Sequence, residues 1–133
     1  MRAGSLVALV LLAGPPPAAD EGARTTNDAV YAEEQAANGE RLYRQHCLQC
    51  HDKRYFRPVL ARWEGQPLGL LYSVMSASMP ESNPGALPRR DYVDILAYIL
   101  SLSRYPAGEA RLDFRDGALD DIVITSRKAA TSD

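Results

Sequence analysis

The sequence predicts an all-α fold with a short extended C-terminal tail, and two segments carry this prediction. From Arg89 to Ser103, apolar residues recur every three or four positions, as on one face of an amphipathic helix. From Glu33 to Gln45, acidic residues come first and a basic residue comes late, the order that the helix dipole favours. The 133 residues, of which 46% are hydrophobic and 24% charged, are typical of one globular domain.

The N-terminus, residues 1–19, predicts a secretory signal peptide. Arg2 precedes an apolar run from Leu6 to Ala13, and prolines and alanines follow. Because this run is shorter than the ~20 residues that cross a bilayer, we expect cleavage and no permanent membrane span. The polar segment 20–30 and the last residues from Thr125 are expected to be flexible.

The helices can be delimited from single residues. Gly39, inside the segment 33–45, costs a helix about 1 kcal/mol relative to alanine, so it predicts a close crossing with another helix. A further helix is expected from about Pro67 to Ala77. Pro88 stands where the last helix can begin, and Pro106 follows its end.

Residues 109–133 differ in character from the helical body. Asp116 and Gly117 lie between two short mixed runs, Leu112–Phe114 and Ile122–Ile124, which indicates a hairpin. Both runs are too short to be stable alone. The tail must therefore pack on the domain or on a partner.

Charge is unevenly distributed, although the net charge is only −2. Between Arg41 and Arg62 one acid, Asp52, accompanies six bases, which we call the basic rim: Arg41, Arg44, Lys53, Arg54, Arg57 and Arg62. The rim is either plain solvated surface or a region that steers an acidic partner. The acidic total and the lack of a continuous basic stripe exclude a nucleic-acid partner.

Residues 46–52, HCLQCHD, contain both cysteines and both histidines of the chain. These four ligands are too crowded to surround one zinc ion. A dithiol redox motif would be expected near a strand-helix-strand pattern, which is absent from the sequence, and a plain disulfide would leave His51 unexplained. The C-x-x-C-H spacing instead predicts covalent attachment of one haem c through Cys47 and Cys50, with His51 as proximal iron ligand. Loss of both thiols in thioether links agrees with export to an oxidising compartment.

The second iron ligand is expected to be a methionine, because no other histidine is free. Met75 lies in an apolar helical stretch and is predicted to fill the core. Met79 precedes Pro80, which favours an extended backbone outside the helix. Met79 is therefore the predicted distal ligand.

Taken in order, these residues resemble a class I monohaem cytochrome c over residues 31–108. The resemblance rests on Gly39, Tyr43, Cys47, Cys50, His51, Pro58, Trp63, Met79, Pro80 and the stretch DYVDILAYIL from Asp91. It implies three to five helices around one covalently bound haem, with Gly39 and Tyr43 crossing Ile95 and Tyr98. It also implies that the Pro58 carbonyl accepts a hydrogen bond from the His51 ring and that Trp63 packs on the haem. The sequence departs from the family after His51, where the usual glycines are missing from HDKRYFRPVL.

The resemblance implies a periplasmic single-electron carrier rather than an enzyme. Its partners would be a dehydrogenase as donor and another cytochrome or a terminal oxidase as acceptor. The tail resembles that of cytochromes that serve periplasmic quinoprotein dehydrogenases, so a tightly bound dehydrogenase subunit is one alternative. A haem sensor or a peroxidase-like enzyme with a labile Met79 is another.

Overall fold

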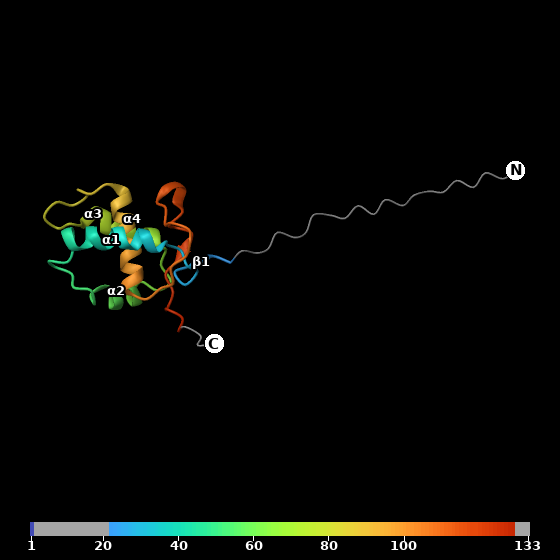
Figure 1. Cartoon of the computed structure of the whole chain (residues 1–133), viewed down its shortest axis with the longest axis horizontal. Coiled ribbons are helices and arrows are strands. Elements are labelled where there is room, and N and C mark those ends of the chain that lie inside the picture. The colour runs from blue at the N-terminus through green and yellow to red at the C-terminus, as the bar shows by residue number, and fades with distance from the viewer. Residues whose placement is uncertain (2–21, 130–133) are drawn as a thin grey trace.

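A computed structural model describes Met1 and residues 22–129 of the chain. It has four α-helices, α1 (Glu33–His46), α2 (Phe56–Arg62), α3 (Leu68–Ser78) and α4 (Arg89–Leu102), a 3-10 turn, η1 (Arg115–Gly117), and two short strands, β1 (Arg24–Thr25) and β2 (Ile122–Val123) (Figure 1). The predicted all-α fold is confirmed. The predicted signal peptide, apart from Met1, lies outside the described residues. Within the described part, none of the helices has the length and apolar character needed to cross a membrane.

The crossing of α1 and α4 forms the centre of the molecule (Figure 1). A Cβ atom at Gly39 would lie 1.8 Å from the carbonyl oxygen of Asp94 and 3.0 Å from Cβ of Tyr98. Glycine is therefore required here, because a side chain would separate the two backbones. Beside it, the rings of Tyr43 and Tyr98 meet edge to face with their centroids 5.3 Å apart. The close crossing predicted from Gly39 is confirmed.

Helix α4 is the most buried element. Every residue from Tyr92 to Leu100 is buried, although the sequence pattern predicted a single apolar face. The reason is that α1, α2 and α3 all pack against α4 and surround it. Residues such as Ile95, Leu96 and Ile99, each at most 1% exposed, form the core.

Helix α2 was not expected from the sequence. The segment after His51 lacks glycine and folds into a short helix, in which Pro58 occupies the first turn. Proline is tolerated there because the first backbone N–H groups of a helix have no partner within it. Leu60 attaches α2 to the core with only 1% exposure.

The predicted hairpin in the tail is wrong. The turn at Asp116 and Gly117 is present as η1, but β2 pairs in parallel with β1, a strand from the N-terminal segment. The tail meets the core instead of pairing with itself, because its short runs gain more by burying their apolar side chains. Four such side chains are at most 5% exposed: Leu112, Leu119, Ile122 and Ile124.

The two ends that were expected to be flexible contact each other between residues 24–27 and 122–128. The Thr26 amide donates to the Val123 carbonyl at 3.0 Å, and Thr26 is fully buried. The side-chain amide of Asn27 donates to the Thr125 hydroxyl at 2.9 Å. Asn27 also accepts a hydrogen bond from the Lys128 amide at 2.9 Å. Each end is polar and unstable alone, and the hydrogen-bond donors and acceptors of one end pair with those of the other.

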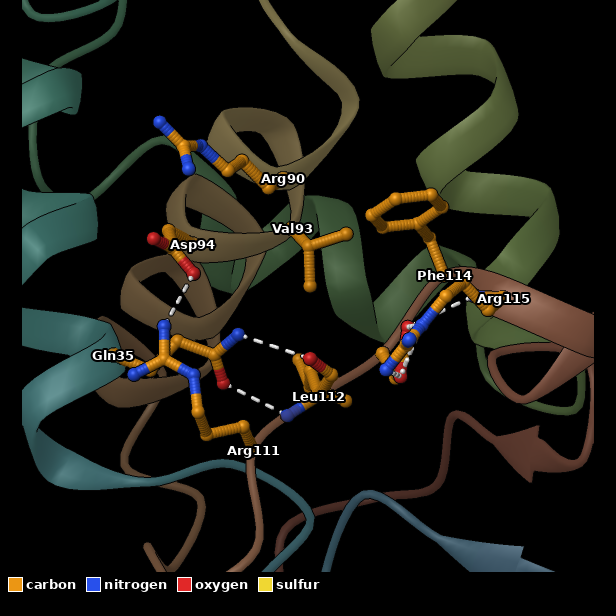
Figure 2. Close-up of a pocket in the computed structure, with 9 residues that line it drawn as sticks. Gln35, Arg90, Val93, Asp94, Arg111, Leu112, Phe114 and Arg115 are labelled. Carbon is orange, nitrogen blue, oxygen red and sulfur yellow. Dashed lines mark hydrogen bonds and ion pairs between the residues drawn. The ribbon is translucent and has the colours of Figure 1, made fainter.

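A second contact holds the tail to the helices (Figure 2). Buried Gln35 of α1 donates to the carbonyl of Leu112 at 3.1 Å and accepts from its amide at 2.8 Å. Arg111 reaches Asp94 of α4 at 3.2 Å (Figure 2). It also pairs with Glu34 of α1 at 2.9 Å. The tail is therefore part of the domain.

Candidate functional site

A cavity of about 370 Å³ opens between the end of α1, the end of α3 and the face of α4. It brings together four of the six predicted site residues: Cys47, Cys50, His51 and Met79. The remaining lining residues are His46, Gln49, Phe56, Met75, Pro80, Glu81, Ser82, Ile95 and Ile99. Residues from distant parts of the chain thus meet around one space.

One backbone turn after α1 arranges the C-x-x-C-H motif. The amide of Cys50 donates to the Cys47 carbonyl at 3.1 Å, and the amide of His51 donates to the same carbonyl at 2.9 Å. The turn brings Cys47, Cys50 and His51 together in the cavity lining. Both cysteines are free thiols, and burial raises the pKa of the Cys47 thiol to about 11.

Tyr43 links this turn to the α1 and α4 crossing. Its hydroxyl donates to the backbone carbonyl of His51 at 2.7 Å, and its ring is fully buried. Burial raises the pKa of the Tyr43 hydroxyl, so that the group remains a hydrogen-bond donor. The position of His51 is therefore set by the packing of the two central helices.

The His51 ring has a buried nitrogen without a partner. Its Nδ1 atom makes no hydrogen bond with any described residue, and the ring lies against Tyr55 and Phe56 at centroid distances of 4.2 and 5.7 Å. A buried polar atom of this kind is rare and costly in a protein. Pro58 does not supply the partner expected from the resemblance, because it lies inside α2, where its carbonyl points along the helix axis.

Met79 ends α3 with an extended backbone, at φ −120° and ψ 154°. The predicted exit from the helix before Pro80 is confirmed. Its carbonyl accepts a hydrogen bond from the hydroxyl of Tyr92 at 2.6 Å. Met75, one turn earlier, packs against the core as predicted, but it also lines the cavity.

Trp63 does not line the cavity. It follows the last residue of α2 and packs half-buried against the core. The sequence pattern did not identify Phe56 as a cavity residue, since the α2 segment gave no helical signal. Ile95 and Ile99 were predicted on the apolar face of their helix, but nothing in that periodicity indicated a cavity beside them.

The net positive charge of the basic rim is smaller than the count of its bases suggested, because an acid neutralises part of it. Glu40, just outside the counted segment, pairs with Arg44 at 2.8 Å and with Lys53 at 3.6 Å. Among the described residues, no acid forms an ion pair with Arg57 or Arg62, both of which are exposed on α2. Three rim bases have no ion-pair partner among the described residues, Arg41, Arg57 and Arg62, and two of the three lie on α2.

The donor set of the cavity fits a covalently bound haem. Two free thiols can form the thioether links, and the unpartnered imidazole fits an iron ligand. The thioether of Met79 is a soft second donor, and the side chains of Phe56, Ile95 and Ile99 make much of the wall apolar. Cys47, Cys50 and His51 would hold the group from one side.

Comparison with known families agrees with this chemistry. Residues 34–99 match a family model described as cytochrome c oxidase, cbb3-type, subunit III. The matched segment runs from α1 into α4 and contains every residue that lines the cavity. Neither the comparison with curated proteins nor that with solved structures found a match. The family match, the all-α fold and the cavity chemistry together support a c-type cytochrome domain, a family whose cofactor is covalently bound haem c.

Proposed function

We propose that the protein is a periplasmic single-electron carrier with one haem c, ligated by His51 and Met79. One observation carries the proposal: a single cavity collects the C-x-x-C-H side chains from one side and Met79 from the end of α3. When bound, the haem supplies one-electron chemistry through its ferrous and ferric states.

The protein residues then have distinct roles. Cys47 and Cys50 would hold the cofactor covalently, and the Tyr43 hydroxyl fixes the backbone that presents His51. The apolar wall would exclude water, and the thioether of Met79 would favour ferrous iron and raise the potential. If His51 and Met79 both ligate the iron, they would leave no position for a substrate, which favours a carrier over an enzyme.

Export and partners follow from the sequence and the charge distribution. The N-terminal segment has the pattern of a secretory signal, which supports a periplasmic location. The donor would be a dehydrogenase and the acceptor another cytochrome or an oxidase, in line with the oxidase named in the family description. Arg57 and Arg62 on α2 would attract an acidic surface of such a partner.

The optical spectrum of the haem-loaded protein separates the carrier from the sensor or peroxidase-like alternative. A carrier shows a thioether-to-iron charge-transfer band in the ferric state and binds carbon monoxide slowly, if at all, after reduction. Rapid binding of carbon monoxide would instead indicate an open or labile axial position and contradict the proposal.

The alternative of a permanently bound dehydrogenase subunit depended on an apolar tail that is free to bind a partner. The apolar side chains of the tail, Leu112, Leu119, Ile122 and Ile124, are buried within this domain. They cannot also form an intermolecular interface without unfolding the tail. This packing supports the diffusible carrier.

A further inference from the structure

We propose that Tyr92 is a positioning residue for Met79 and holds the axial methionine in place by joining both ends of its loop. The loop comprises residues 79–87, between α3 and α4, and we call it the Met79 loop. This inference rests on the proposed ligation by Met79. It assigns a role to a side chain that lies outside the cavity lining.

The hydroxyl of Tyr92 makes two hydrogen bonds of opposite direction. It donates to the carbonyl of Met79 at 2.6 Å and accepts from the amide of Leu87 at 3.4 Å. The first partner begins the Met79 loop and the second ends it. One oxygen atom therefore closes the loop, which a phenylalanine ring in the same place could not do.

The rest of the Met79 loop has little other attachment to the helical body. Residues 81–86 are all exposed. The remaining hydrogen bonds within the loop join its own members: Asn83 to Pro80 at 2.9 Å, Gly85 to Met79 at 3.3 Å and Ala86 to Asn83 at 3.3 Å. Such a segment opens easily unless another element restrains it.

Tyr92 provides that restraint because it belongs to the most buried helix. The residue itself is 3% exposed and lies in the first turns of α4, which crosses α1 at Gly39. A buried hydroxyl without partners is costly, so the helix and the Met79 loop stabilise each other's position. The rigidity of the central crossing thus extends to the backbone that carries the Met79 sulfur.

Tyr92→Phe tests the proposal in the haem-loaded protein, because it removes the hydroxyl and keeps the ring. Added imidazole competes with Met79 for ferric iron, so its apparent affinity reports how firmly the methionine is held. Loss of the hydrogen bond from the Tyr92 hydroxyl to the Met79 carbonyl predicts roughly fivefold tighter imidazole binding. Amide hydrogen exchange at Leu87 should accelerate by a similar factor, because that amide loses its acceptor.

Tyr98→Phe is the matched control. Tyr98 is also buried on α4, but its hydroxyl makes a long contact of 3.5 Å with Glu40 and no hydrogen bond to the Met79 loop. The imidazole affinity of the Tyr98→Phe protein and its rate of amide hydrogen exchange at Leu87 should equal those of the wild type. An equal effect in both variants would overturn the inference, because it would indicate general loosening of the core.

The outcomes separate this inference from the proposed function. A wild-type ferric spectrum without a thioether charge-transfer band would overturn ligation by Met79 and the role of Tyr92 with it. An intact band together with unchanged imidazole affinity in Tyr92→Phe would overturn the role of Tyr92 alone.

Discussion

Replacement of Gly39 by alanine tests the helix crossing on which the site is built. The added Cβ would lie 1.8 Å from the Asp94 carbonyl oxygen, whereas a carbon and an oxygen in contact need about 3.3 Å. The clash is with backbone, which cannot rotate away, so α1 and α4 must separate by roughly 1.5 Å. Overpacking of a core costs about 1–3 kcal/mol and occasionally more, and alanine recovers about 1 kcal/mol of helix propensity. Because the clash is with backbone, we expect a cost at the upper end of this range, about 3 kcal/mol, and therefore a net loss of about 2 kcal/mol in the free energy of unfolding.

Urea unfolding of the haem-loaded protein, followed by far-UV circular dichroism, measures this loss as a lower midpoint with an unchanged slope. Ala37→Gly is the matched control. Ala37 is exposed on the same helix, and the substitution exchanges the same two residue types in the opposite direction. It should lose about 1 kcal/mol through propensity alone. If Gly39→Ala were as stable as the wild type or more stable, the close crossing would be refuted.

Three further predictions concern the tail and the charged surface. Gln35→Leu removes both side-chain hydrogen bonds to Leu112, so trypsin should cleave the tail several-fold faster, and unchanged protection would refute the attachment. The Arg115 guanidinium lowers the pKa of Asp113 from its usual 3.8 to about 2. The stabilising contact is therefore present above pH 3.8 and is lost as the pH falls toward 2. A carbon NMR titration of the Asp113 carboxyl should show the lowered pKa, and Arg115→Gln should raise it. Arg57→Glu should slow the oxidation of the reduced, haem-loaded protein by anionic hexacyanoferrate at low ionic strength but not at about 1 M salt. Equal rates for the variant and the wild type at low salt would show that this charge lies outside the path of anionic oxidants.

The parts of the fold that were predictable depend on local sequence. The apolar spacing around Ile95 and Ile99 indicated α4, and Gly39 indicated its crossing partner. The C-x-x-C-H motif lies within one backbone turn, so its geometry follows from neighbouring residues. Met79 was placed outside its helix by Pro80, which is also a local effect.

The parts that were missed depend on contacts between distant residues. Gln35 and Leu112 are 77 positions apart, and β1 pairs with a strand almost 100 positions later. No periodicity within either partner encodes such a pairing. Local composition therefore indicated flexible ends where the two ends hold each other, and a hairpin where the tail contacts α1.

The ferric absorption spectrum of two variants, Met79→Ala and Met75→Ala, tests the central claim most directly, because both methionines line the same cavity. Our account predicts that the exported, haem-loaded Met79→Ala protein loses the thioether charge-transfer band and has a lower midpoint potential, while Met75→Ala keeps the band. A Met79→Ala protein with the band and potential of the wild type, or an exported chain without porphyrin, would contradict it.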